Sequence, residues 1–119
     1  MTPDHERATK PEDLTRLFVE LGNAGDATGL AALYEPDAVV AFPPGQMTVG
    51  RDAIRSLYGK MLAAKPHFRL EEPLPTVQIG DLALTATPAL DEAGARAQVV
   101  RRQADGTWLR ILDRPDFRG

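Results

Sequence analysis

Few side chains in this sequence are suited to catalysis, and several mechanisms can be set aside from the inventory alone. The chain has no cysteine, a single serine at position 56 and two histidines, His5 and His67. Thiol chemistry is therefore excluded, and Ser56 lies in a predicted helix rather than on the strand–turn–helix of a hydrolase nucleophile. The two histidines are far apart and lack the spacing of metal ligands. We expect neither a metal nor another cofactor.

Asp113 and Gln98 are the strongest candidates for chemistry. Strands are predicted at residues 95–103 and 107–114, and the turn residues 104–106 between them favour a hairpin. Residues that lie opposite each other in a hairpin have side chains in contact. We therefore expect Gln98 to lie close to Asp113.

This pair of side chains is typical of proton transfer at carbon. A desolvated carboxylate can remove a proton near neutral pH, which makes Asp113 a candidate base. Gln98 or Arg96 could then hold the enolate oxygen that develops. Purely structural roles remain open for Asp113: pairing with Arg96, Arg110 or Arg114, or capping a turn before Pro115.

The last strand should present two faces, because successive side chains of a strand point to opposite sides. We interpret Trp108, on the face opposite Asp113, as a core or interface residue. The two predicted sets are Thr107, Leu109, Ile111 and Asp113, and Trp108, Arg110, Leu112 and Arg114.

Three helices are predicted ahead of these strands. Pro11 and the two acidic residues after it are typical of a helix start. Residues 22–26 end this helix, a short second one stops before Pro36, and a third runs from residue 50 until Pro66. Their apolar faces are Leu14, Leu17, Phe18 and Leu21; Leu30, Leu33 and Tyr34; and Ile54, Leu57, Tyr58, Met61 and Leu62.

Strands account for most of the remaining sequence. A first strand is predicted at 38–42, and from residue 67 the apolar period changes from helical to two. Four strands follow, at 67–79, 82–90, 95–103 and 107–114. Helices followed by a run of antiparallel strands indicate an α+β fold, with the helices on one face of the sheet.

Length and charge limit the class of protein. The 119 residues suffice for one domain, which we assign to 11–119, after a flexible tail at 1–10. A net charge of −3 argues against a nucleic-acid partner. No segment approaches the roughly 20 apolar residues of a membrane span, and the polar N-terminus is no secretory signal. We expect a cytoplasmic protein that binds neither nucleic acid nor membrane.

Several motifs in order resemble the SnoaL-like, ketosteroid-isomerase-like proteins, which share the nuclear transport factor 2-like or cystatin-like fold. The opening FVELGNAGD at 18–26, LAALY at 30–34 and EPDAVV at 35–40 is similar to theirs. So are GRDAIR at 50–55 and DGTW at 105–108. The resemblance extends over about residues 12–114. It implies three helices wrapped around a strongly bent, mostly antiparallel sheet, which together form a cone with an apolar pocket.

The resemblance also tests the steroid isomerase mechanism. The isomerase base falls at Phe42, before Pro43, and the oxyanion tyrosine falls at Phe18. A phenyl ring neither accepts nor donates a proton. The second oxyanion donor, an acid in those enzymes, aligns with Gln98. We therefore expect no steroid isomerisation by that mechanism.

The polyketide aldol-cyclase branch offers a closer match. Asp113 resembles its base on the last strand, and Gln98 resembles a partner on the strand before. Val100 stands where that branch has a histidine. We expect Tyr34 and Tyr58 to pack with tethered hydroxyls and His67 to be exposed. By resemblance the residues lining the pocket beside Asp113 and Gln98 are Phe18, Tyr34, Val40, Phe42, Tyr58, Leu62, Arg96, Val100 and Ile111.

Two functions from different classes fit these observations. One is a small enzyme of cyclase, isomerase or dehydratase type that acts on an apolar carbonyl compound, with Asp113 as base. The other is a module of the same fold that only binds a ligand or dimerises. A homodimer is expected in either case, because the resemblance implies pairing through the outer sheet face, which should carry Trp108 and Leu112.

Overall fold

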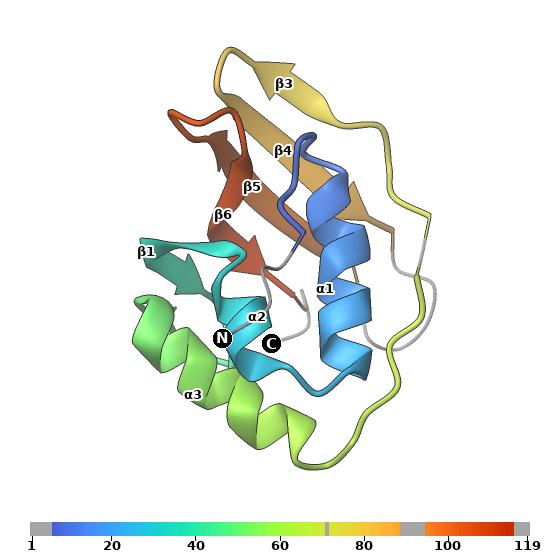
Figure 1. Ribbon diagram of the computed structural model, residues 1–119, viewed down its shortest axis with the longest axis vertical. Helices are drawn as coiled ribbons and strands as arrows, with labels where there is room; N and C mark the ends of the chain where they lie inside the picture. The colour runs from blue at the N-terminus through green and yellow to red at the C-terminus, as the bar shows by residue number, and fades with distance from the viewer. Residues whose placement is uncertain (1–5, 71, 89–94, 116–119) are drawn as a thin grey trace.

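The computed structural model describes residues 6–70, 72–88 and 95–115 of the chain. Three helices come first, interrupted by two strands, and four strands follow (Figure 1). The elements are α1 (Asp13–Asn23), α2 (Ala27–Ala31), β1 (Tyr34–Val40), β2 (Thr48–Val49), α3 (Arg51–Leu62), β3 (Val77–Ile79), β4 (Leu82–Thr87), β5 (Arg96–Arg102) and β6 (Trp108–Arg114).

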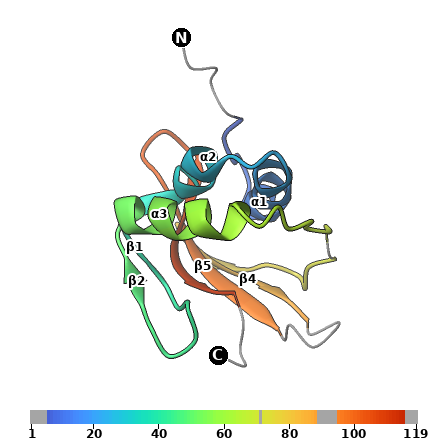
Figure 2. The same cartoon turned by 90° about the horizontal axis from the view of Figure 1, so that it is seen from below.

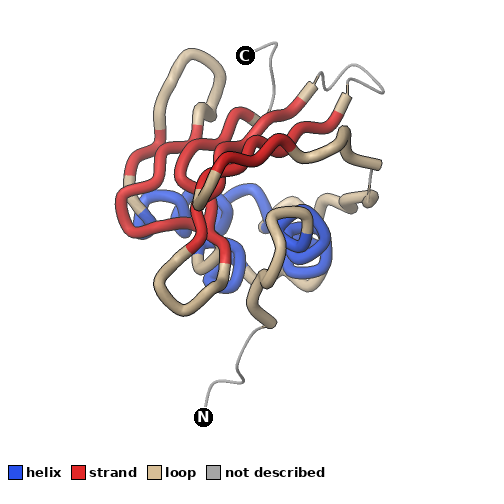
Figure 3. Tube along the Cα trace, turned by 90° about the horizontal axis from the view of Figure 1, so that it is seen from above, coloured by secondary structure: helices blue, strands red, loops and turns tan. Residues whose placement is uncertain are grey.

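The strands form one curled sheet in the order β2-β1-β6-β5-β4-β3, which does not close into a barrel. Among the described strands, β1 and β6 pair in parallel and the other pairs are antiparallel. All three helices cover one face of the sheet, as Figures 2 and 3 show from opposite sides. The α+β class expected from the sequence, with helices on one face of a bent sheet, is confirmed.

The apolar helix faces form the core against this sheet. Leu14 and Leu17 of α1, Leu30 of α2 and Ile54 of α3 are at most 3% exposed. The Asp26 carboxylate caps α2 by accepting a hydrogen bond from the Gly29 amide at 2.8 Å. These contacts hold the helices over the strands that carry the candidate site.

Two predicted boundaries are wrong in the first half of the chain. Tyr34 was expected at the end of the second helix, but it begins β1, where it pairs with Arg110 of β6. This pairing joins segments far apart in sequence, so no local pattern signals it. The predicted strand at 38–42 accordingly begins earlier and ends at Val40. The two-residue strand β2 was not predicted.

The strand predicted at 67–79 is also wrong over most of its length, since only β3 (Val77–Ile79) is a strand. Pro73 and Pro75 lie just before it, and proline has no N–H to donate to a strand ladder. The next prediction, 82–90, corresponds to β4, which ends at Thr87. Residues 89 and 90 lie outside the described part.

A β-bulge in β6 decides which side chains face the helices. Val99 pairs with Leu112 and Val100 pairs with Arg110, so Ile111 has no partner opposite it. The bulge reverses the alternation on which the predicted faces depended. Trp108 and Arg110 are each 3% exposed and Asp113 is 4% exposed, so all three lie on the helix side.

The predicted faces of β6 are therefore partly wrong. Asp113 points inward and Leu112, 50% exposed, points outward, as expected. Trp108 and Arg110 were expected on the outer face and are buried instead. A regular strand cannot contain all three inward residues on one face, and the extra residue Ile111 allows it.

Part of the predicted N-terminal tail is held against the sheet. The Ala8 carbonyl accepts a hydrogen bond from the Trp108 amide at 2.9 Å, and Ala8 is 2% exposed. Residues 6–10 are thus not a free tail. The first five residues of that prediction lie outside the described part.

Candidate functional site

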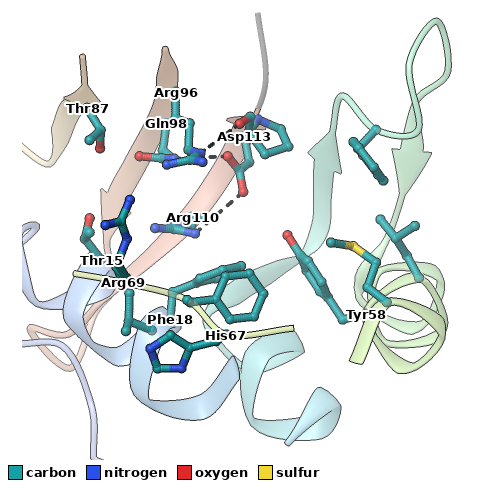
Figure 4. A pocket seen from close by; sticks show the side chains of 16 residues that line it. Thr15, Phe18, Tyr58, His67, Arg69, Thr87, Arg96, Gln98, Arg110 and Asp113 are labelled. Atoms are coloured by element: carbon teal, nitrogen blue, oxygen red, sulfur yellow. Dashed lines mark hydrogen bonds and ion pairs between the residues drawn. The ribbon is translucent and has the colours of Figure 1, made fainter. Parts of the chain in front are cut away.

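A cavity of about 440 Å³ lies between the helices and the inner face of β5 and β6 (Figure 4). Its volume is in the range of small-molecule sites. Phe18 of α1 and Tyr58 of α3 contribute aromatic rings, which contact edge to face with centroids 5.5 Å apart. The segment after α3 closes a further side with Phe68 and Arg69.

The polar wall of this pocket is centred on Asp113. Its Oδ1 accepts a hydrogen bond from Nε2 of Gln98 at 3.2 Å. Its Oδ2 accepts one from the Tyr34 hydroxyl at 2.5 Å and lies 3.6 Å from Nη1 of Arg110. The predicted proximity of Gln98 and Asp113 is confirmed, because the two residues are direct partners in the hairpin.

Hydrogen bonds extend from Asp113 in two directions. The side-chain oxygen Oε1 of Gln98 accepts a hydrogen bond from the Thr85 hydroxyl at 2.8 Å. This bond orients the side-chain nitrogen Nε2 toward Asp113. On the other side the Tyr34 and Tyr58 hydroxyl oxygens are 2.8 Å apart. Because Tyr34 has one O–H and donates it to Asp113, Tyr58 is the donor in that pair. The five side chains form one buried network.

Electrostatics within the network keep both tyrosines protonated. Burial raises the pKa of Tyr34 well above its ordinary value, and the neighbouring charge of Asp113 raises it further. Burial and the same carboxylate also raise the pKa of Tyr58. The tyrosines therefore act as neutral hydrogen-bond donors toward Asp113.

Arg110 supplies the positive charge of the network. Burial alone would lower its pKa, but Tyr34 and Asp113 outweigh that effect and raise it. Its guanidinium lies 5.1 Å from the centre of the Phe18 ring. Of the structural roles left open for Asp113, pairing with Arg110 is present.

The structure brings together only some of the predicted site residues. Four predicted residues lie elsewhere: Val40, Leu62 and Val100 are buried in the core, and Ile111 is the bulge residue. Tyr34 lies behind the wall, where it reaches Asp113 but does not line the cavity. The predicted residues that do line it are Phe18, Phe42, Tyr58, Arg96, Gln98 and Asp113.

Other lining residues were not predicted as part of the site. Arg110 was missed because the bulge that turns it inward has no recognisable sequence signal. His67 is exposed, as expected, yet it lies at the rim of the pocket beside Arg69. His67 and Arg69 belong to an irregular segment, whose path cannot be predicted from a repeating pattern of hydrophobic residues.

Two further properties of the described residues bear on other functions. In the part of the chain that the structure describes, no three histidine, cysteine, aspartate or glutamate residues gather into a metal site. None of the described helices is both long and apolar enough to cross a membrane.

Solved structures of similar fold come from several bacteria. One from Streptomyces avermitilis, proposed as a dehydratase of the nuclear transport factor 2-like family, has a TM-score of 0.69 at 18% identity, covering 87% of this chain and 90% of that one. A ketosteroid isomerase-like protein from Erwinia carotovora atroseptica has a TM-score of 0.66 at 20% identity, with coverage of 87% and 89%.

A third similar structure is a nuclear transport factor 2-like protein with a cystatin-like fold from Novosphingobium aromaticivorans. Its TM-score is 0.65 at 21% identity, with coverage of 86% of this chain and 75% of that one. At these identities the likeness establishes the fold alone. None of the curated proteins compared with this chain matches it.

The family itself is established by sequence. The model of the SnoaL-like domain matches residues 15–111, which include most of α1, the bulge residue Ile111 and, of the polar wall, Gln98 and Arg110 but not Asp113. The cone-like arrangement of helices over a curled sheet agrees with this match. The chain belongs to the SnoaL-like domain family.

Proposed function

We propose that this chain is an acid/base enzyme acting on an apolar carbonyl compound, with Asp113 as the base. The observation that carries the proposal is the position of the Asp113 carboxylate, which is buried on the pocket wall. Its Oδ1 receives a hydrogen bond from Gln98, which leaves a lone pair of that oxygen for a substrate proton.

The reaction begins when Oδ1 removes a proton from the carbon next to a carbonyl group. Negative charge then develops on the carbonyl oxygen, and the second N–H of the Gln98 amide is available to stabilise it. Arg96 places a positive charge on the same wall. Isomerisation, dehydration and cyclisation can all start from such an enolate.

The apolar side of the pocket supports this chemistry. Phe18, Phe42 and Met61 line the cavity and limit the water around Asp113. A dry surrounding strengthens the electrostatic stabilisation of the enolate by fixed donors.

A specific observation also favours a second function, a pocket that binds without catalysis. The Tyr34 hydroxyl and the Arg110 guanidinium both contact Oδ2 of Asp113. These contacts give the carboxylate a structural role in the wall that needs no proton transfer. The two functions share the pocket and differ in whether Asp113 accepts a substrate proton.

Exchange of carbon-bound protons separates the two. The probe is 2-tetralone in D2O, whose loss of α-proton signals is followed by NMR. For the enzyme, the wild-type chain accelerates exchange and Asp113→Asn lowers that rate by about 10²–10⁴-fold, the usual loss for a general base. Asp37→Asn, at an exposed aspartate of β1, is the matched control and keeps the wild-type rate.

The melting temperature of each variant is measured as a control, so that loss of folding is not mistaken for loss of the base. Asp113→Asn leaves Arg110 without its charged partner, which should cost about 1–3 kcal/mol of stability. Exchange is therefore measured well below the melting temperature of the variant. Equal exchange rates for the wild type and Asp113→Asn would overturn the role of Asp113 as base.

We further propose that a second copy of the chain covers the outer face of the sheet. Val77, Leu84, Val99 and Leu112 are direct neighbours across β3, β4, β5 and β6. Val77, Leu84 and Leu112 are 66%, 43% and 50% exposed. A continuous apolar row of this kind is typical of a symmetric interface.

A further inference from the structure

The pocket concentrates positive charge in a chain that is acidic as a whole. The net charge is −3, yet three arginines line the cavity. Asp113 is the one acidic side chain among the described residues that line it. The three arginines, Arg69, Arg96 and Arg110, come from different parts of the sequence, so the fold rather than a local run of basic residues gathers them.

Arg110 has donors that no other described residue uses. A guanidinium carries five N–H bonds. Nη1 contacts Tyr34 and Asp113, at 3.4 and 3.6 Å, which are long for hydrogen bonds. Nε is buried and has no partner among the described residues. A buried guanidinium this poorly satisfied is costly, and because Arg110 lines the cavity, a bound molecule can accept from the part of its guanidinium that faces the pocket.

The negative charge of Asp113 offsets only one of these three positive charges. Its Oδ2 lies 3.6 Å from Nη1 of Arg110, and its oxygens accept hydrogen bonds from Tyr34 and Gln98. Figure 4 shows Arg69 directed from the segment after α3 toward the wall that carries Arg110. Arg69 has no hydrogen bond or ion pair with any other described residue, and it is exposed at the rim.

The remaining surface of the pocket suits a flat apolar body. Phe18 and Phe68 contact edge to face with ring centroids 5.7 Å apart, and Phe42, Leu57 and Met61 add further apolar surface. The cavity of about 440 Å³ is large enough for one or two fused rings.

We infer that the pocket takes a small organic anion, an apolar molecule with one carboxylate whose charge is held by Arg110 and Arg69. This inference rests on the proposed function in using the same pocket, and it narrows the substrate to an acid that also carries a carbonyl group. The carboxylate supplies the acceptors that the guanidinium of Arg110 lacks, in the charge-assisted geometry that arginine favours.

Calorimetric titration with a matched pair of probes tests the inference without any activity. The probes are 2-naphthoate and 2-naphthamide, which have the same shape and differ in charge. At low salt we expect 2-naphthoate to bind the wild-type chain about tenfold or more tightly than the amide. Equal affinity for the two probes, or no binding of 2-naphthoate at millimolar concentration, overturns the inference.

Variants identify which charge is responsible. Arg69→Gln, at an exposed position, should weaken 2-naphthoate severalfold and leave 2-naphthamide unchanged. Arg55→Gln, an exposed arginine of α3 that does not line the cavity, should change neither. Equal weakening of both probes in Arg69→Gln contradicts a charge-specific site.

Arg110→Lys keeps a positive charge but removes the fork of donors, and should weaken 2-naphthoate by about tenfold. If this buried substitution prevents folding, the comparison of Arg69→Gln with Arg55→Gln decides the question. If the chain shows no preference for 2-naphthoate, the anion site is ruled out but Asp113 can still act as a base on a neutral carbonyl compound. If the tetralone experiment shows no proton exchange, the proposed catalysis is ruled out but the anion site still stands. The two failures are therefore distinguishable.

Discussion

Two rows of side chains cross this sheet one residue apart, and their chemistry is opposite. The polar row consists of Thr85, Gln98 and Asp113, paired in register across β4, β5 and β6. All three are at most 6% exposed and face the helices. The apolar row is displaced by one residue and consists of Val77, Leu84, Val99 and Leu112, with three of these four strongly exposed.

The buried polar row and the exposed apolar row give the two faces of the same strands different roles. Polar groups can stay inside because each bonds to its neighbours along the row, which removes most of the cost of burial. Apolar groups on the outside have no such compensation and favour a covering surface. Gln98 and Asp113 of the inner row line the pocket and Thr85 donates to Gln98, whereas we propose that the outer row forms an interface.

The largest effect is expected when one residue of each row is replaced by a residue of the opposite polarity. Asp113→Leu leaves Arg110 as an unpaired buried charge and should cost about 3–5 kcal/mol of unfolding free energy. The matched change Leu112→Asp, at the neighbouring exposed position, should alter the monomer by about 0.5 kcal/mol or less. Urea denaturation measures both. Similar losses for the two variants would remove the distinction between the rows.

The outer row predicts a change of assembly rather than of folding. Leu84→Glu places a charge in the middle of the apolar row and should convert a dimer to a monomer in sedimentation velocity at micromolar concentration. Its secondary structure should stay unchanged, because Leu84 is already 43% exposed. A wild-type chain that sediments only as a monomer contradicts the proposed interface.

Within the inner network, Tyr34 should matter more than Tyr58. Tyr34→Phe removes a hydroxyl that donates to Asp113 and accepts from Tyr58 and Arg110, so three buried groups lose a partner. The expected cost is about 1–3 kcal/mol. Tyr58→Phe removes only the terminal donor and should cost about 0.5–1.5 kcal/mol. Urea denaturation of both variants checks the order, and a reversed order would contradict the donor directions assigned here.

The smallest effect concerns Glu35 of β1, whose pKa is lowered by hydrogen bonds from Arg101 and Gln103 despite its partial burial. A lowered folded-state pKa stabilises the fold above the ordinary value of 4.5, and this contribution is lost as pH falls through the folded value. Glu35→Gln should therefore cost about 0.2–1 kcal/mol at pH 7, because solvent screens the exposed Arg101.

The pH dependence of that variant provides its test. The difference in unfolding free energy between the wild type and Glu35→Gln should shrink as pH falls below 4.5. A difference that is constant from pH 7 to acid would assign the loss to packing rather than to charge.

Local sequence patterns predict the three helices and the strands β4, β5 and β6. The stripe of Leu14 and Leu17 and the turn residues 104–106 are local signals, because helical and strand periods depend on neighbours along the chain. The same hairpin placed Gln98 beside Asp113, so the centre of the candidate site followed from local pairing.

The surroundings of that centre depend on contacts between segments that are distant in the sequence. Tyr34 reaches Asp113 because β1 pairs in parallel with β6, and Arg110 turns inward because Ile111 bulges out of register. Arg69 joins the pocket through an irregular segment packed against α1, where Asn23 donates to the Phe68 carbonyl at 2.9 Å. These contacts depend on long-range pairing and on one unpaired residue, and neither leaves a period in the sequence.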